Sequence, residues 1–407
     1  MKCRHCGAEL RLPFIDLGRS PPSNAYLTRA QLNEPEKRYP LRVLVCETCW
    51  LVQTEDYVGA GDLFTDEYAY FSSVSRTFLD HAEQYVEAMR ERLRLGKQSL
   101  VAEIAANDGY LLQYVRQRGI PCYGVEPTKS TAAAAREKGL RIVEAFFGKK
   151  LASSLAAQGQ QADLVVANNV LAHVPDINDF TGGVATLLKP DGVATFEFPY
   201  LLNLVRENQF DTIYHEHYSY LSLTAVDHIF RANGLAVIDV EHLPTHGGSI
   251  RVFAQSAAAG APACAAVAAM IAEENRAGVN KAHFYSGLQA RAEAVKKTLL
   301  AFLGEQKSAG RKVGAYGAAA KGNTLLNFAG VGVDLVPYVV DRNPVKQGKY
   351  LPGSRIPVVN ELHLMMDQPD WILVLPWNLR REIEQQLARV KEWGGKFVYA
   401  IPELVFS

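Results

Sequence analysis

The sequence predicts an α/β protein of three domains, in which a small zinc-binding domain precedes two domains built on parallel sheets. Two Cys-x-x-Cys pairs stand near the N-terminus, and strands alternate with helical segments twice, over residues 99–200 and 313–400. The 407 residues are too many for one ordinary core. We expect domains at residues 1–70, 71–255 and 256–407.

The charge composition argues against nucleic acid and membrane partners. Lys+Arg and Asp+Glu are equal at 43 each, so no basic field attracts a phosphate backbone or an anionic bilayer. The N-terminus lacks the apolar core of a signal peptide, and the alanine-rich run over 257–272 is interrupted by Gly260 and Pro262. We therefore expect a soluble, cytoplasmic protein whose cysteines bind metal rather than form disulfides.

Four N-terminal cysteines have the spacing of one tetrahedral zinc site. Cys3-x-x-Cys6 and Cys46-x-x-Cys49 are two knuckles that can hold one Zn(II) ion with thiolates at about 2.3 Å. The chain between them is loop-rich and contains several prolines, so a metal would staple it, and we interpret the zinc as structural. Two disulfides are the alternative, and His5 is a weaker alternative to one of the cysteines.

The first strands of the central domain lead into a turn that suits a bound cofactor. A buried strand over 99–105 runs into Ala106-Asn107-Asp108-Gly109, where small residues let a cofactor approach the backbone. A second strand, over 121–126, ends in Glu126, whose carboxylate can accept hydrogen bonds from ribose hydroxyls. This spacing fits NAD or S-adenosylmethionine. Of the three glycines of the dinucleotide pattern only Gly109 is present, which disfavours NAD.

Further strands over 141–143, 163–167 and 192–197 complete the predicted parallel sheet. Ligands of such sheets lie beyond the carboxyl ends of the strands. Asn168 and Asn169 follow the fourth strand and bring polar groups to that edge, although Asn168 also suits a helix cap.

The densest run of ionisable side chains is Tyr214-His215-Glu216-His217-Tyr218-Ser219-Tyr220. These side chains can take up and donate protons and can stabilise an oxyanion, so we interpret the run as the catalytic stretch. We expect a strand with His215 and His217 on one face, which makes a metal site the alternative. A second aromatic run, over 66–73, lies at a domain junction and fits either packing or the lining of a pocket.

The C-terminal domain repeats the strand–helix pattern. A long amphipathic helix over 284–303 precedes a strand at 313–316, and further strands follow at 335–340, 371–376 and 396–400. Gly317 to Thr324 combines small residues, a lysine and a threonine at a helix start, which suits a phosphate cradle but lacks the ending of a P-loop. Before this domain, the glycine pair in His246-Gly247-Gly248-Ser249 fits a tight turn or a backbone that faces a ligand.

Taken together, these motifs resemble the three-domain, S-adenosylmethionine-dependent C-methyltransferases of nucleotide-linked 4-keto-deoxysugars. The resemblance covers nearly the whole chain and rests on the two cysteine pairs and on five motifs, at 103–109, 169–173, 214–220, 246–249 and 317–323 with 346–353. Ala105-Ala106 stand where the family pattern has Gly-Ser, a departure that tightens the cofactor turn.

The resemblance implies a central class I methyltransferase domain with a Rossmann-like fold and a second Rossmann-like α/β domain after it. It also implies methylation at C3 of the sugar through an enolate, with His217 as the base, Tyr214 and Glu216 beside it, and Tyr68 and His173 orienting the sugar or stabilising the enolate. The protein would be a monomer or a homodimer.

The expected ligand-binding residues fall into two groups. Those assigned to S-adenosylmethionine are Glu103, Asn107, Asp108, Gly109, Glu126, Asn168 and Asn169. Those assigned to the nucleotide-sugar are Tyr70, His246, Gly247, Gly248, Ser249, Lys321, Asn323 and Asp341. Two other functions remain open, an NAD-dependent nucleotide-sugar oxidoreductase and a non-catalytic zinc-containing binding module.

Overall fold

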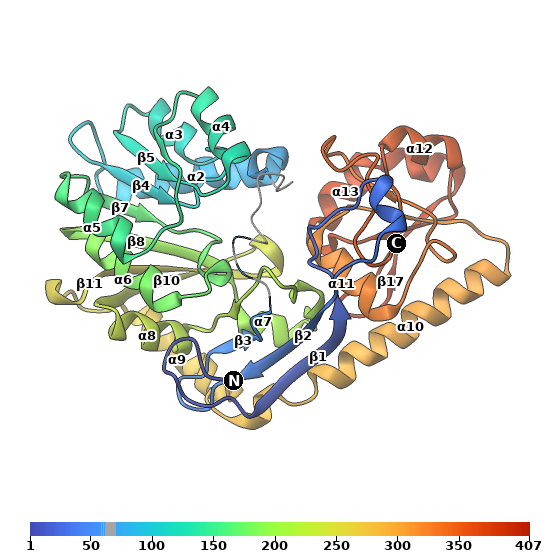
Figure 1. The fold of residues 1–407 in the computed structure, drawn as a ribbon, viewed down its shortest axis with the longest axis horizontal. Helices are drawn as coiled ribbons and strands as arrows, with labels where there is room; N and C mark the ends of the chain where they lie inside the picture. Colours follow the sequence, from blue (N-terminus) through green and yellow to red (C-terminus); the bar gives the residue numbers. More distant parts are fainter. Residues whose placement is uncertain (58, 60, 62–70) are drawn as a thin grey trace.

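The computed structural model describes residues 1–57, 59, 61 and 71–407. Figure 1 shows the central and C-terminal domains side by side, with strands β1 (Leu12–Ser20) and β2 (Tyr39–Val45) running beneath them. The long helix α10 (Leu288–Ser308) extends along the lower edge of the C-terminal domain. The three expected parts are therefore present, and together they make a mixed α/β architecture.

The N-terminal sheet is antiparallel and takes its last strand from the run at 214–220. Its strand order is β1-β2-β3-β9, where β3 is Val52–Thr54 and β9 is Ser219–Tyr220. Val52 pairs with Tyr220, so the end of the run at 214–220 is joined to the cysteine-bearing domain.

The central sheet has seven strands in the order β10-β11-β8-β7-β4-β5-β6. The five strands from β6 to β8 are parallel, while β11 is antiparallel to both of its neighbours. The strands are β4 (Val101–Ile104), β5 (Cys122–Val125), β6 (Ile142–Val143), β7 (Ala162–Val166), β8 (Leu188–Pro199), β10 (Leu235–Leu243) and β11 (Ser249–Ser256). The antiparallel β10–β11 pair distinguishes this sheet from the all-parallel order of dinucleotide-binding domains.

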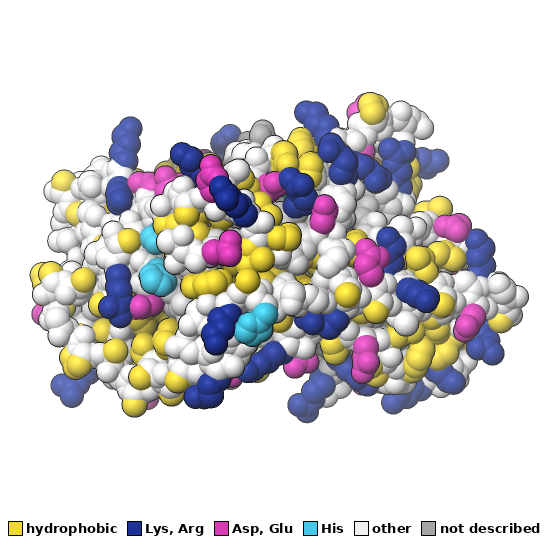
Figure 2. All heavy atoms as spheres, turned by 90° about the horizontal axis from the view of Figure 1, so that it is seen from below, with side chains coloured by type: hydrophobic (Ala, Val, Ile, Leu, Met, Phe, Trp, Pro, Cys, Tyr) yellow, Lys and Arg dark blue, Asp and Glu magenta, His cyan; other side chains and the backbone are white. Residues whose placement is uncertain are grey.

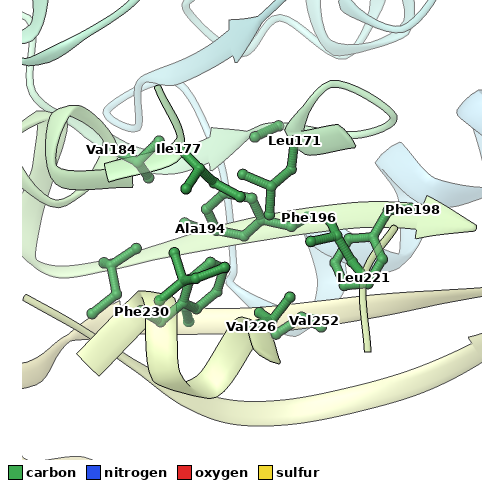
Figure 3. Packing of buried hydrophobic residues seen from close by; sticks show 14 of the residues in the cluster. Leu171, Ile177, Val184, Ala194, Phe196, Phe198, Leu221, Val226, Phe230 and Val252 are labelled. Carbon is green, nitrogen blue, oxygen red and sulfur yellow. The ribbon is translucent and has the colours of Figure 1, made fainter. Parts of the chain in front are cut away.

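Helices cover both faces of this sheet. They are α2 (Arg76–Arg92), α3 (Leu112–Gln117), α4 (Lys129–Glu137), α5 (Lys149–Ala157), α6 (Ile177–Leu187), α7 (Leu201–Arg206) and α8 (Leu223–Ala232). Figure 3 shows side chains of β8 facing α8, and the rings of Phe196 and Phe230 lie 4.6 Å apart between their centroids. Burial of each such ring stabilises the fold by roughly 1.5–3 kcal/mol.

Helix α9 (Ala265–Ala277) packs on the central domain although the predicted boundary assigns it to the C-terminal one. Its buried Glu274 accepts hydrogen bonds from the backbone N–H groups of Leu223 and Thr224 at 2.6 and 2.7 Å. These are among the N–H groups that an isolated α8 would leave without an acceptor, so α9 caps α8 from outside. The boundaries themselves stay predictions.

The C-terminal sheet has the order β14-β13-β12-β15-β16-β17, parallel except for β17. Its elements are β12 (Val313–Tyr316), α11 (Ala320–Ala329), β13 (Val339–Val340), β14 (Val358–Val359), α12 (Glu361–Asp367), β15 (Trp371–Val374), α13 (Arg380–Gln386), β16 (Lys396–Tyr399) and β17 (Val405–Phe406). The strand expected over 335–340 is shorter than predicted, because only Val339 and Val340 pair with β12.

A single hydrophobic cluster joins the N-terminal sheet to α10 and the C-terminal domain. Val43 of β2, Leu299 of α10 and Leu326 of α11 all belong to it and are almost fully buried. Within the described residues, no helix combines the length and apolar character that a membrane span requires. On the face shown in Figure 2, basic and acidic side chains are interspersed among hydrophobic ones.

Candidate active site

One cavity of about 630 Å³ receives residues from all three parts of the chain. Asn24 comes from the N-terminal part, Glu126 and His217 from the central part, and Lys321 from α11. A volume of this size is ordinary for the binding site of a small molecule.

The rim of the cavity at the end of β4 has an unusual backbone. Ala105 and Asn107 both have positive φ, at 57° and 50°, a conformation that L-residues adopt at a cost. Gly109 has φ of 74°, and a Cβ there would lie 2.3 Å from Leu140. Ala105 and Asn107 line the cavity, whereas Gly109 builds the turn from behind.

Glu126 stands at the end of β5 and lines the same cavity. Its Oε2 accepts from the backbone N–H of Asn107 at 2.9 Å, and its Oε1 accepts from Thr128 N–H and the Thr131 hydroxyl, both at 3.0 Å. Burial is the main influence and raises the pKa of Glu126. A carboxylate at this rim can accept a hydrogen bond from a ribose hydroxyl.

Asn168 and Asn169 line the cavity beside Glu126, while two of the acids assigned to the cofactor do not. Glu103 is 1% exposed within the sheet, where burial raises its pKa well above its usual value. Asp108 accepts from Ser73 and forms an ion pair with Lys138 at 3.2 Å. These two acids support the turn instead of facing the cavity.

The cavity lining also includes apolar side chains, namely Ile104, Val125, Phe146, Phe147, Val170 and Phe180. A carboxylate and amides beside apolar side chains match the ribose, the amino-acid part and the adenine of S-adenosylmethionine. The residues present therefore fit this cofactor.

The catalytic stretch is not the regular strand that we expected. The backbone N–H of His217 donates to the carbonyl of Tyr214 at 2.9 Å, which makes a turn, and strand β9 begins only at Ser219. His215 and His217 therefore do not share a strand face, because a turn breaks the two-residue alternation. The ring of His215 points to the N-terminal sheet, where its Nε2 lies 3.2 Å from the carbonyl of Pro40.

His217 is held at both ring nitrogens. Its Nδ1 lies 2.8 Å from the carbonyl of Thr212, which can only accept, so Nδ1 carries the proton. Its Nε2 lies 2.7 Å from the hydroxyl of Tyr214 and accepts from it. Burial, followed by the neighbouring His173, lowers the pKa of His217 well below its usual value of 6.5. The imidazole is thus neutral, and its basic nitrogen faces a phenol.

His173 lies against His217, with 4.7 Å between the ring centroids. Its Nδ1 donates to the backbone carbonyl of Glu216 at 2.8 Å, and burial lowers its pKa to about 4. Both imidazoles line the cavity as neutral rings.

The side chain of Glu216 does not line the cavity and contacts the N-terminal part of the chain. Its Oε1 accepts from the backbone N–H and the side-chain amide of Asn24, at 3.3 and 3.2 Å. Its Oε2 is buried and has no hydrogen-bond partner among the described residues. Burial raises the pKa of Glu216 to about 7. Glu216 therefore ties the catalytic turn to Asn24 and does not contact His217 through its carboxylate.

Of the residues expected to bind the nucleotide-sugar, His246 and Lys321 line the cavity. His246 has φ of 56°, and its buried Nε2 has no hydrogen-bond partner among the described residues. Gly247, Gly248 and Ser249 form the turn below it, and a Cβ on Gly247 would lie 2.4 Å from the ring of Trp377.

Asn323 and Asp341 lie behind the cavity wall. The side-chain amide of Asn323 donates to the carbonyl of Ser23 at 2.6 Å, and Asp341 accepts from the backbone N–H of Ala318 at 2.8 Å. The expected phosphate cradle thus uses one of its own N–H groups internally. Tyr68 and Tyr70 lie outside the described residues.

The sequence analysis did not assign three of the cavity-lining residues to the site. Asn24, Phe146 and Lys346 all line the cavity. Lys346 stood in a motif of the resemblance, so that signal was available, but nothing local marks Asn24 or Phe146.

The four N-terminal cysteines converge on one point. All four sulfurs lie within 4.8 Å of one another, with Cys3 and Cys49 3.6 Å apart and Cys6 and Cys46 3.5 Å apart. A tetrahedral Zn–S site with bonds of about 2.3 Å sets its sulfurs about 3.8 Å apart. The cluster therefore fits zinc, and none of its cysteines lines the cavity.

Three family models match the chain in this same order. "Putative zinc binding domain" matches residues 3–64, "Methyltransferase domain" matches 78–240, and "C-methyltransferase C-terminal domain" matches 244–402. The C-methyltransferase NovU of Streptomyces niveus is 36% identical over 402 residues, which are 99% of this chain and 96% of that protein. The chain belongs to this C-methyltransferase family. The predicted three-domain organisation, with a zinc-binding and a methyltransferase domain, is confirmed.

Solved structures resemble less than half of this chain, and only distantly. The magnesium protoporphyrin IX methyltransferase of Synechocystis PCC 6803 with bound SAH is 16% identical, with a TM-score of 0.35, over 44% of this chain and 83% of that one. An S-adenosylmethionine-dependent methyltransferase of Clostridium acetobutylicum is 13% identical, with a TM-score of 0.36, over 44% and 92%. Likenesses this distant carry no argument about function.

Proposed function

We propose that the protein transfers the methyl group of S-adenosylmethionine to C3 of a nucleoside-diphosphate 4-keto-deoxysugar, as a step of deoxysugar biosynthesis. One observation carries the proposal: the ribose-type acid Glu126 and the Tyr214–His217 pair line the same cavity. A methyl donor and a proton acceptor are the two components that C-methylation of a C–H acid requires.

The proton chemistry falls to His217. A 4-keto group acidifies the C3–H bond of the sugar. When that bond breaks, its electron pair passes into the C3–C4 bond and onto the keto oxygen, and the proton ends on Nε2 of His217 by way of the Tyr214 hydroxyl. The hydrogen bond of 2.7 Å between these two groups supports such a relay. His173, beside His217, orients the sugar, and Tyr68 shares that role by resemblance.

S-adenosylmethionine, when bound, supplies an electrophilic methyl group. Asn107, Glu126, Asn168 and Asn169 would hold it, while Glu103, Asp108 and Gly109 shape the turn beneath. Transfer of this methyl group to the enolate carbon would give a C3-methylated 4-keto sugar and leave S-adenosylhomocysteine.

The C-terminal wall of the cavity is the proposed site of the nucleotide. Lys346 brings positive charge to this wall, which suits a diphosphate. Asp341 fixes the loop at Ala318, and Asn323 fixes the wall to Ser23, so both would act by holding the binding surface in place.

Ligand-dependent stability separates a methyltransferase from the alternative of an NAD-dependent oxidoreductase. A ligand at 100 times its Kd stabilises a protein by about 2.7 kcal/mol. S-adenosylhomocysteine or sinefungin should therefore raise the melting temperature, and NAD should leave it unchanged. The reverse pattern would refute the cofactor assignment.

The substrate is tested with a panel of nucleotide-linked 4-keto-deoxysugars. Each sugar is incubated with enzyme and S-adenosylmethionine, and the molecular masses of the products are measured by mass spectrometry. We expect one sugar to gain the mass of a methylene group, with the new carbon at C3. Methylation on oxygen or nitrogen, or none with any 4-keto sugar, would contradict the proposal.

A further inference from the structure

Lys321 brings a cation into the catalytic cavity from the C-terminal domain. It lies in the first turn of α11 and lines the cavity together with Tyr214, His173 and His217. Its ammonium group donates to Oδ1 of Asn378 at 2.7 Å and lies 4.5 Å from the ring centroid of Trp377. A lysine held by one neutral amide and an aromatic face keeps unused donor capacity, because an ammonium group carries three N–H donors.

The ring below Lys321 is anchored in turn by a buried acid. Nε1 of Trp377 donates to Oδ2 of Asp211 at 2.7 Å, and Asp211 is 0% exposed. Its Oδ1 has no hydrogen-bond partner among the described residues. Burial lowers the pKa of Lys321, and the charge of Asp211 opposes this effect in part.

The short helix that carries Asp211 also positions the base. This 3-10 helix, η4, spans Phe210–Thr212, and its last residue accepts the Nδ1–H of His217 at 2.8 Å. The next residue, Ile213, accepts from the hydroxyl of Thr324 on α11 at 2.8 Å. Thr324 is three residues after Lys321, on the same side of the helix. One segment therefore sets the places of both the imidazole and the ammonium group.

Given the proposed reaction, on which this step rests, we infer that Lys321 is a catalytic residue whose ammonium group stabilises the keto oxygen of the sugar as it becomes an enolate oxygen. The proton of C3 goes to His217, the electron pair goes to the oxygen, and Lys321 keeps its own protons. A neutral, buried imidazole is a weak base, so the cavity must lower the energy of the enolate. A cation held in the cavity has that effect.

The competing role of Lys321 is binding of a diphosphate, and two measurements separate the two roles. The first is affinity for thymidine and uridine 5′-diphosphates by calorimetry. The second is exchange of the substrate C3 proton in D2O with S-adenosylhomocysteine in place of the methyl donor. A phosphate ligand affects the first, whereas an oxyanion partner affects the second.

Lys321→Met should slow proton exchange and methyl transfer by about 100-fold or more while nucleoside diphosphate affinity changes less than about threefold. Lys321→Arg keeps the positive charge on a larger, planar group and should recover part of the exchange rate. The matched control is Lys296→Met, since Lys296 also lies over an aromatic ring, 4.9 Å from Phe328, outside the cavity lining. It should leave both measurements unchanged.

Trp377→Phe tests the anchor without removing the lysine. It keeps an aromatic face but loses the hydrogen bond to Asp211, so exchange should slow by about tenfold with diphosphate affinity unchanged. Loss of diphosphate affinity in Lys321→Met with exchange retained at saturation would overturn the inference. Absence of exchange in the wild-type enzyme with every 4-keto sugar would instead refute the proposed function.

Discussion

The hydroxyl of Tyr214 lies 2.7 Å from Nε2 of His217, and the opposite nitrogen of that imidazole is held by the carbonyl of Thr212 at 2.8 Å. The tautomer is therefore fixed before any substrate binds, with the basic nitrogen toward the phenol. A ring fixed at both nitrogens cannot reorient, which favours proton transfer along one direction.

Replacement of His217 by Asn should abolish both proton exchange and methylation, because the acceptor nitrogen is lost. The expected loss is about 100-fold to 10,000-fold, the usual contribution of a positioned base. Cofactor affinity should be kept, since Glu126 and its partners are untouched. The readout is deuterium incorporation at C3 with S-adenosylhomocysteine bound.

His215→Asn is the matched control for that experiment. His215 belongs to the same turn but contacts Pro40 and the ring of Tyr39, at 6.0 Å between centroids. Exchange should remain within a few-fold of wild type. If His215→Asn loses exchange and His217→Asn keeps it, the base is misassigned.

Glu216→Gln should stabilise the protein at high pH. Burial raises the pKa of Glu216 to about 7, against an ordinary 4.5, so the folded state holds this proton more tightly than the unfolded chain. The stability that follows is fully present below pH 4.5 and is lost as pH rises through 7. The variant should match wild type near pH 4.5 and exceed it by up to about 3 kcal/mol at pH 8.

Glu55→Gln provides the opposite case, because hydrogen bonding to Arg42 lowers the pKa of Glu55. This partly exposed pair contributes little to stability, and Glu55→Gln should gain none at pH 8. Denaturant titrations of both variants across this pH range give the measurement. A Glu216→Gln protein with the same pH dependence as wild type would mean that the carboxyl ionises normally in the folded state.

Zinc should be bound once per chain, and its loss should destabilise the fold rather than only the chemistry. Cys46 is 0% exposed and belongs to the same hydrophobic cluster as the central sheet. Cys46→Ser should lower metal content and stability together, because metal binding is coupled to folding. Elemental analysis and thermal melts give both quantities, and Cys122→Ser, which removes a thiol outside the cluster, should leave them unchanged. A Cys46→Ser protein that folds normally but has no turnover would make the zinc catalytic.

Local sequence patterns were sufficient to predict cavity-lining residues that directly follow a strand. Glu126 lines the cavity because β5 ends there, and the same rule brought Asn168 and Asn169 to the rim. The predicted two-residue alternation of a strand was wrong at 214–220, because a backbone hydrogen bond from His217 to Tyr214 closes a turn. Polar residues are as compatible with a turn as with a strand. His215 and His217 consequently face different domains.

Contacts between domains were beyond local reasoning. Asn24 forms a hydrogen bond with Glu216, 192 residues away in the sequence, and Trp377 forms one with Asp211, 166 residues away. No periodicity or spacing joins such residues, because their meeting depends on how the folded domains pack. The same holds for Lys321, whose helix was predicted but whose place beside the histidines was not.

The backbone of the turn after β4 gives the last prediction. Ala105 has φ of 57°, where a Cβ is strained and glycine is not, whereas its neighbour Ala106 has no positive φ and is 0% exposed. Ala105→Gly should relieve that strain, offset in part by the greater freedom of glycine in the unfolded chain, for a net gain of about 0.5–1 kcal/mol. Ala106→Gly should instead lower the free energy of unfolding by about 1 kcal/mol. The buried methyl group is lost, and glycine increases the conformational entropy of the unfolded chain. The unfolding free energies of the two variants without ligand should therefore change in opposite directions. Equal losses in both would show that Ala105 bears no strain and that the turn has adapted to alanine.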